Sequence, residues 1–231
     1  MEIFKYEILS KANYTGSLLS SCEIINNYIN CIHINCSSRN FVQLTNLPDN
    51  LLSLNCSRNK ITTLDNLPKN LKVLDCHVNK IVELKNLPNK LEILDCSENQ
   101  FINLDWLPES LLYLYCIGCE INSLENLPNL LVELTCYNNN LNKLFIPDNL
   151  KKLDICGNKN FRNLKNINFS KNHKLEKFFC EFDDYYLDND LTPIENLPKS
   201  INFIGTNVFG SNNKKYLEIL NEKNIIIMRY C

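Results

Sequence analysis

The chain has 231 residues, of which 45% are hydrophobic, and this is enough for one globular domain or one elongated repeat array. Its formal net charge of −2 lacks the basic excess of a nucleic-acid binder, so we expect no nucleic-acid partner. The apolar run at residues 225–228 is far shorter than the roughly 20 residues that span a bilayer, so we expect no membrane association.

Residues 1–26 are predicted to form an N-terminal cap. Leu18, Leu19, Cys22 and Ile25 recur at helical spacing. A stack of repeats has open ends, and terminal segments must cover the exposed core there. Charged residues interrupt the apolar ones near the start of the chain, so we expect no secretory signal peptide.

Residues 27–210 are predicted to be a repeat array with a period of about 20 residues. Five consecutive copies follow the pattern L-x-x-L-x-C-x-x-N-x-I/F-x-x-L with few departures, and each opens with Leu-Pro. They begin at Leu47, Leu67, Leu87, Leu107 and Leu127. One imperfect copy precedes them and less regular turns follow them. We predict about eight turns in all.

Residues 211–231 are predicted to form a C-terminal cap of one helix and one strand. The helix is expected to begin near Asn212 or Asn213, because Tyr216, Leu217 and Leu220 indicate a short helix. The apolar residues 225–227 are expected to form the final strand.

The repeat pattern matches the leucine-rich-repeat consensus, with Cys at its third apolar position. The Leu-Pro opening resembles the short repeats of bacterial type III effectors, and the Asn-rich, Cys-bearing version resembles leucine-rich-repeat proteins of giant, mimivirus-like viruses. The resemblance covers roughly residues 27–206. It implies a leucine-rich-repeat solenoid, of the α/β superhelix class, with a parallel β-sheet on its concave face.

The repeat prolines indicate the backbone conformation of the convex face. They stand at positions 48, 68, 88, 108 and 128. Each fixes its own φ near −65° and moves the preceding residue away from helical geometry. A turn of about 20 residues also leaves little chain for a helix. We therefore expect an extended or polyproline-like convex side.

Two kinds of column, apolar and polar, are predicted to point inward. The apolar columns contain Leu47, Leu51, Leu54, Cys56, Ile61 and Leu64 with their equivalents in the other copies. Within Ser53–Cys56, Leu54 and Cys56 face the core while Ser53 and Asn55 face out, because side chains alternate along a strand. The polar column has side-chain amides that are expected to bond backbone groups where the chain leaves each strand. It contains Asn59, Asn79, Asn99, Asn139 and Asn158, with Cys119 in place of one Asn.

The 12 cysteines predict buried free thiols rather than disulfides. Cys36, Cys56 and their equivalents recur in an apolar column, where each acts as a small hydrophobic side chain. So many free thiols indicate a reducing compartment. Thiols along one line do not converge on a metal, and the pair Cys116 and Cys119 fits two ordinary repeat positions, so we expect no metal site and no cofactor.

No catalytic motif stands out, and the chain is expected not to be an enzyme. His33 and His77 fall at outward positions and are expected to be solvated. The acidic residues between Glu181 and Asp190 lack the order of a calcium loop and are expected to form a solvated loop.

The candidate binding surface lies on the outward positions of the middle strands. The outward side chains of the first repeats are polar, whereas those of the middle strands are apolar and aromatic. Exposed apolar and aromatic groups are typical of interaction sites. Asp75 and Asp95 are expected to lie side by side, a like-charge arrangement that a cationic group would relieve. The candidate partner-binding residues are Val73, Asp75, Ile93, Asp95, Tyr113, Tyr115 and Tyr137.

Together these features predict a non-catalytic protein–protein interaction module that acts in the cytoplasm. The resemblances add a viral or pathogen protein that acts on a host protein, in the host cytoplasm. The alternatives are a structural, virion-associated protein and a substrate-recognition subunit of a ubiquitin ligase. We expect a protein partner and no small-molecule substrate.

Overall fold

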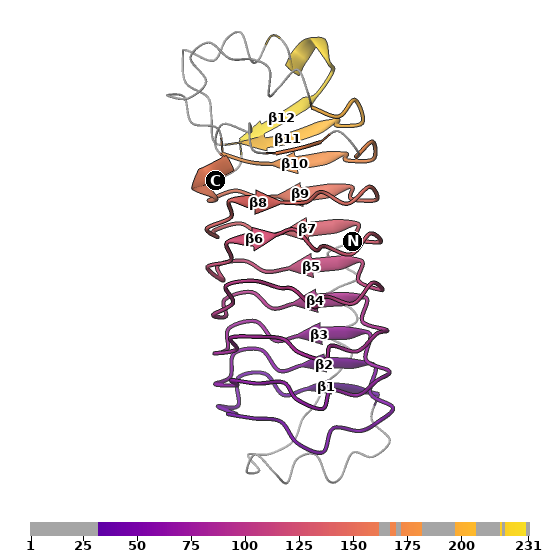
Figure 1. Ribbon diagram of the computed structural model, residues 1–231, viewed down its shortest axis with the longest axis vertical. Coiled ribbons are helices and arrows are strands. Elements are labelled where there is room, and N and C mark those ends of the chain that lie inside the picture. The colour runs from indigo at the N-terminus through magenta and orange to yellow at the C-terminus, as the bar shows by residue number, and fades with distance from the viewer. Residues whose placement is uncertain are drawn as a thin grey trace.

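The computed structural model describes residues 32–161, 167–169, 172–181, 197–206, 218 and 220–229. These residues form a curved stack of turns in which each turn contributes one strand to a long parallel sheet (Figure 1). The predicted N-terminal cap, residues 1–26, lies outside the described residues. No helix among the described residues is long and apolar enough to cross a membrane.

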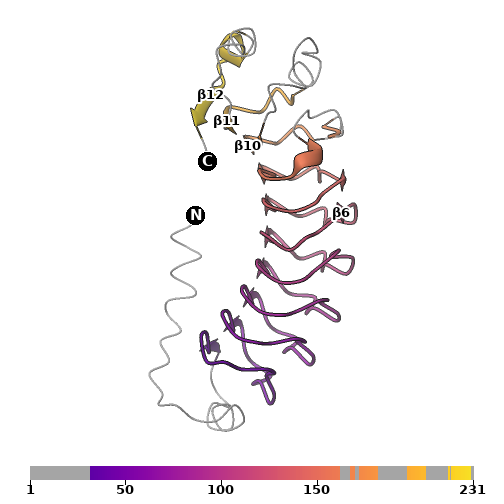
Figure 2. The same cartoon turned by 90° about the vertical axis from the view of Figure 1, so that its left-hand side faces the viewer.

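The long sheet has ten strands, all parallel, in the order β1-β2-β3-β4-β5-β7-β9-β10-β11-β12. It lines the inner side of the arc (Figure 2), as the leucine-rich-repeat pattern predicts. The strands are β1 (His33–Asn35), β2 (Ser53–Asn55), β3 (Val73–Asp75), β4 (Ile93–Asp95), β5 (Tyr113–Tyr115), β7 (Glu133–Thr135), β9 (Lys152–Asp154), β10 (Lys177–Phe179), β11 (Phe203–Thr206) and β12 (Ile226–Arg229).

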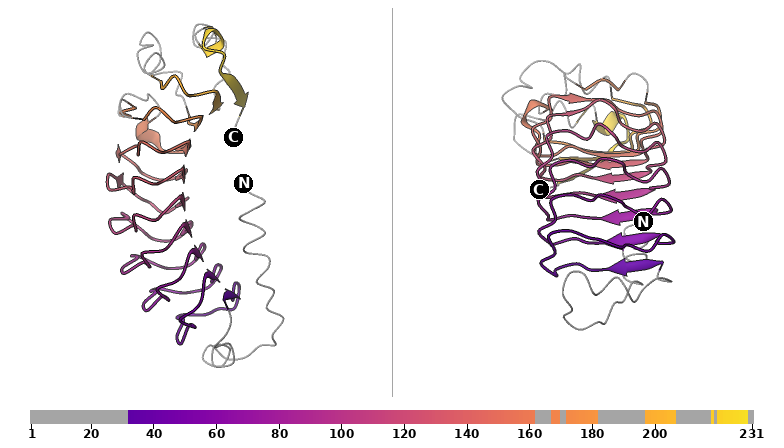
Figure 3. Two further views of the ribbon diagram at one scale, coloured as in Figure 1. Left: turned by 90° about the vertical axis from the view of Figure 1, so that its right-hand side faces the viewer. Right: turned by 60° about the horizontal axis from the view of Figure 1, so that its bottom comes forward.

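The outer side is extended chain with tight turns, and its only regular elements among the described residues are short. β6 (Ser123–Leu124) pairs with β8 (Lys143–Leu144), and a single 3₁₀ turn, η1, spans Lys159–Phe161. Each repeat proline accepts a hydrogen bond from the amide three residues later, as Pro68 does from Leu71 at 3.0 Å. The left panel of Figure 3 shows these turns along the outer edge of the arc.

The predicted inward columns form one continuous core. Leu54, Cys56 and Ile61 are fully buried, and so are their equivalents in the next repeats. The described cysteines are all free and buried, as predicted. They are Cys36, Cys56, Cys76, Cys96, Cys116, Cys119, Cys136, Cys156 and Cys180.

The predicted asparagine column forms a hydrogen-bonded ladder between turns. The Asn139 amide nitrogen donates to the carbonyls of Cys116 (2.8 Å) and Cys136 (3.0 Å). Its oxygen accepts from the amides of Cys119 and Ile121, each at 3.0 Å. Cys119, which replaces Asn, donates its Sγ to the carbonyl of Cys96 at 3.4 Å. The ladder thus satisfies buried backbone groups at the bend that follows each strand.

The C-terminal end keeps the same parallel arrangement. β12 pairs with β11 in register, Ile226 with Phe203, and this agrees with the predicted final strand. Residues 220–222 are helical. The predicted start of the helix near Asn212 or Asn213 lies outside the described residues, and the cap boundaries at 210 and 211 remain a prediction.

The residue before each asparagine of the ladder adopts a left-handed conformation. The position holds Gly118 (φ 60°) and Gly157 (φ 70°) in two turns but Val78 (φ 53°) in another. A β-branched residue is the least suited to this region of φ/ψ space, because its two γ substituents add to the crowding of Cβ against the following carbonyl. The bend after β3 therefore holds a strained backbone.

We expect Val78→Gly to raise the free energy of unfolding by about 1 kcal/mol. The left-handed conformation costs an ordinary residue roughly 1–2 kcal/mol, and part of the gain is lost because glycine is more flexible when unfolded. Gly118→Val is the reverse control and should destabilise, although its Cβ would meet only Glu98 Cγ, at 3.9 Å. Urea denaturation followed by circular dichroism measures both, and a loss of stability in Val78→Gly would contradict the argument.

Candidate binding surface

The structure places the predicted partner-binding residues in two rows across neighbouring strands. Val73, Ile93 and Tyr113 pair in register along the first row. Asp75, Asp95 and Tyr115 pair along the second. Tyr137 follows β7, two residues beyond its last residue, Thr135. The strand register therefore brings six of the seven residues side by side.

The depth of these side chains differs from the prediction. Val73, Asp75 and Asp95 keep only 7%, 5% and 9% of their exposure, so these three outward-facing side chains are buried and not exposed. Ile93, Tyr113, Tyr115 and Tyr137 are half-buried. Strands in a sheet lie about 4.8 Å apart, so neighbouring outward side chains shield one another, and a concave surface brings them closer still.

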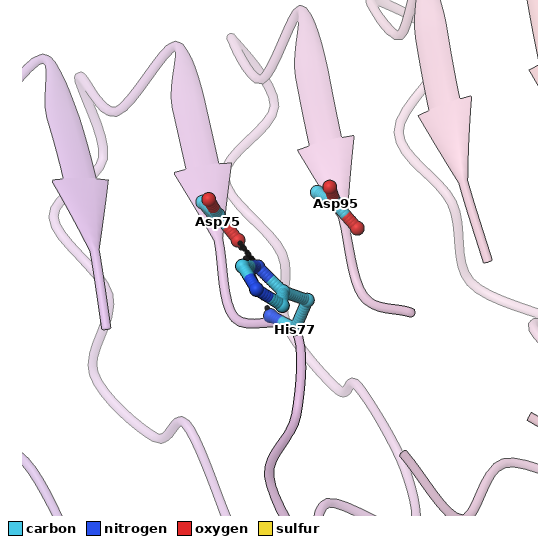
Figure 4. A group of neighbouring side chains, drawn as sticks. All are labelled: Asp75, His77 and Asp95. Atoms are coloured by element: carbon cyan, nitrogen blue, oxygen red, sulfur yellow. Dashed lines mark hydrogen bonds and ion pairs between the residues drawn. The ribbon is translucent and has the colours of Figure 1, made fainter. Parts of the chain in front are cut away.

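His77 lies against Asp75, which corrects the prediction of a solvated histidine. Its Nδ1 is 2.6 Å from Asp75 Oδ1, and its backbone amide donates to the same oxygen at 3.3 Å. Figure 4 shows the imidazole turned toward this carboxylate at the end of β3. The hydrogen bond to Asp75 raises the pKa of His77, burial opposes this, and the charges of Asp75 and Asp95 add to the increase.

Asp95 completes a compact group with these two residues. It is the register partner of Asp75, and its Oδ1 accepts the backbone amide of Ser97 at 3.2 Å. One ligand atom from each of Asp75, His77 and Asp95 lies within 4.8 Å of the others. Two buried carboxylates and one imidazole are therefore close enough to share a cation, an arrangement that the repeat pattern did not predict.

A second polar group lies farther along the same face. Burial raises the pKa of Tyr115, as do the negative charge of Glu133 and a hydrogen bond to its side chain. Glu133 also forms an ion pair with Lys152, with Nζ to Oε1 at 2.8 Å. Lys152 Nζ lies 5.8 Å from the centre of the Phe179 ring. The middle of the concave face thus carries an apolar row bordered by charged side chains.

The buried thiols are poor candidates for chemistry. Burial raises the pKa of Cys76 and Cys96 well above 9.0, and it raises that of Cys119 to about 12. A hydrogen bond with Cys136 is the main cause of the raised pKa of Cys116, and burial is the second cause. The thiolate is the form that attacks substrates and binds metals, so these protonated thiols suit a core and not an active site.

The contact of His77 with Asp75 was not predicted from the sequence. A signal for it exists, because Asp75 and His77 are two positions apart and side chains in a strand repeat their direction every two residues. Equivalent positions in successive repeats do not reveal a contact within one repeat.

Solved structures similar to this chain include bacterial leucine-rich-repeat effectors. A Shigella effector LRR domain matches with a TM-score of 0.59 and 26% identity, over 98% of this chain and 96% of that chain. YopM from Yersinia enterocolitica WA-314 matches with a TM-score of 0.53 and 24% identity, over 71% of this chain but only 39% of that chain. YopM from Yersinia pestis, a leucine-rich effector protein, matches with a TM-score of 0.51 and 22% identity, over 89% and 70%.

No protein-family model and no curated relative matches the chain. The structural matches confirm the leucine-rich-repeat solenoid and the predicted likeness to bacterial effectors. The resemblance to giant-virus proteins receives no support from these matches and stays a prediction.

Proposed function

We propose that this protein is a non-catalytic binding module that docks a partner protein on its concave sheet, over strands β3, β4, β5 and β7. The observation that carries the proposal is the change in side chains along the face. The outward positions of β2 hold Ser53 and Asn55, whereas β5 holds Tyr113 and Tyr115. Aromatic side chains of this kind dominate the energetics of protein interfaces, because they bury a large area and lose little conformational entropy.

The structural matches support a biological setting for this module. They are with effectors of bacterial pathogens, and one of them covers nearly the whole chain. We therefore propose a pathogen protein, bacterial or viral, that binds a host protein in the host cytoplasm. The free, buried thiols fit such a reducing compartment.

Partner capture followed by point variants tests the docking surface. After affinity capture from host cytosol and identification by mass spectrometry, Tyr113→Ala and Tyr115→Ala should each weaken binding by roughly 30-fold, or about 2 kcal/mol. Asp75→Asn should reduce the salt dependence of binding if a basic group on the partner faces it. Circular dichroism must show that each variant retains the fold.

Two controls separate the concave face from the rest of the molecule. Tyr113→Phe keeps the aromatic ring and should bind nearly as the parent does. Lys69→Glu lies at an exposed position outside the long sheet and should leave binding unchanged. The docking proposal fails if the tyrosine variants bind normally while Lys69→Glu abolishes binding, and absence of any stoichiometric partner would favour the structural, virion-associated alternative.

A further inference from the structure

We propose that Asp75, His77 and Asp95 form a binding site for a divalent transition metal ion of the zinc, cobalt and nickel class. The carboxylates end β3 and β4, and His77 follows Asp75 by two residues on the same face (Figure 4). Their ligand atoms lie within 4.8 Å of one another. Tetrahedral bonds of about 2.1 Å to one ion would separate such atoms by roughly 3.4 Å, so changes in side-chain torsions suffice to bring them around it.

The protein backbone holds the ligands in place. Asp75 and Asp95 are register partners in a parallel sheet, which fixes the distance between their Cα atoms. Each carboxylate also accepts a backbone amide, that of His77 at 3.3 Å and that of Ser97 at 3.2 Å. Hydrogen bonds of this kind orient ligands around a metal and strengthen its binding.

The fold itself does not require this set of residues. In the preceding repeat, Asn55 Oδ1 accepts the amide of Ser57 at 3.0 Å and its hydroxyl at 2.7 Å, so Asn and Ser serve the same bend. The next repeat has Asp95 and Ser97, and there too the amide donates to the carboxylate. Among the repeats that the structure describes, an imidazole beside two buried carboxylates occurs only at Asp75, His77 and Asp95.

The donor set indicates the class of metal. Imidazole and carboxylate together suit zinc, cobalt and nickel, whereas calcium and magnesium require a shell of oxygen ligands. Three protein ligands leave a coordination position for water or for a further side chain, as in zinc sites with an open position. The half-buried His77 lies on the concave face, so that position would be reached from the same side as a docked partner.

Cobalt titration of the full chain, purified with chelator and kept reduced, tests the site without any partner. We expect saturable binding of one Co²⁺, with visible ligand-field bands and no thiolate-to-cobalt charge-transfer band, and zinc should displace the cobalt. Zinc should also raise the thermal unfolding midpoint, because it binds only the folded arrangement. Calcium and magnesium should neither displace cobalt nor raise the thermal unfolding midpoint.

Variants that copy the neighbouring repeat keep the test free of folding artefacts. His77→Ser introduces the residue that stands at position 57 in the preceding repeat. Because loss of an outer-shell partner already weakens metal binding by up to about 100-fold, loss of this direct ligand should weaken cobalt binding by more than that. Asp95→Asn should weaken it as well. The control is Asp154→Asn, because Asp154 is a buried carboxylate that accepts the amide of Cys156 at 3.1 Å, and this variant should bind cobalt as the parent does.

Three results would overturn the metal site. One is the absence of saturable cobalt binding, and the second is a thiolate charge-transfer band that survives in His77→Ser, which would place the metal on cysteines. The third is equal binding of calcium. None of these results depends on a protein partner, so failure of the metal site leaves the proposed docking function untouched.

Discussion

Asn139→Ala is expected to lower the free energy of unfolding by about 4 kcal/mol. The substitution removes the hydrogen-bond partner of the Cys116 carbonyl and of the Cys119 and Ile121 amides. These groups lie at buried residues, and each one left unsatisfied costs about 1–3 kcal/mol. The Cys136 carbonyl suffers less, because Asn158 also donates to it, at 2.9 Å.

The measurement is urea denaturation, with hydrogen exchange of the Ile121 amide as a local probe. Asn139→Cys copies the natural Cys119 and keeps a donor, so it should lose less stability than Asn139→Ala. Asn122→Ala changes an exposed side chain and should stay within about 0.5 kcal/mol of the parent. If Asn139→Ala behaved like Asn122→Ala, the ladder would not contribute to stability.

Because of the thiol column, the free energy of unfolding is expected to fall progressively above pH 9. Burial raises the pKa of Cys56, Cys76 and Cys96 well above the 9.0 of an unfolded thiol. Below pH 9 these thiols are protonated in both states, so the stability that they contribute is fully present. As the pH rises past 9 the unfolded chain releases protons that the folded chain retains, so the free energy of unfolding falls. The urea midpoint should therefore drop progressively between pH 9 and the raised folded-state pKa values.

Thiol titration under anaerobic conditions checks the same column at pH 8. The nine described cysteines should be unreactive in the native protein and should react in denaturant. The other three of the 12, Cys22, Cys31 and Cys231, lie outside the described residues and are counted separately by peptide mapping. Rapid native labelling of Cys76, or a disulfide that includes it, would contradict the assignment.

The strand register could be predicted from the sequence because the repeats have equal length. Residues at the same position of successive copies, such as Asp75 and Asp95, must then lie opposite each other. After β9 the repeats lose their equal length, but Leu175, Phe178 and Cys180 keep the spacing of Leu150, Leu153 and Ile155. Phe178 pairs with Leu153, as this spacing indicates.

Burial on the concave face was not predictable from the position of a residue alone. Ser53 points outward and yet keeps only 1% of its exposure. Its neighbours in the sheet are His33 and Val73, and the depth of a small side chain depends on such larger neighbours. The contact of His77 with Asp75 likewise depends on a side-chain rotation, which a repeat pattern does not encode.

The asparagine ladder also determines how the molecule would respond to a pulling force. Its hydrogen bonds join successive turns, as Asn139 does with Cys119, 20 residues away. A force that separates the two ends of the stack would load these bonds one turn at a time. Each regular turn released would add about 70 Å of contour length, because an extended residue spans roughly 3.5 Å. A ligand seated across several strands would share the load between turns, so the solenoid would yield in even steps when free and resist extension when bound.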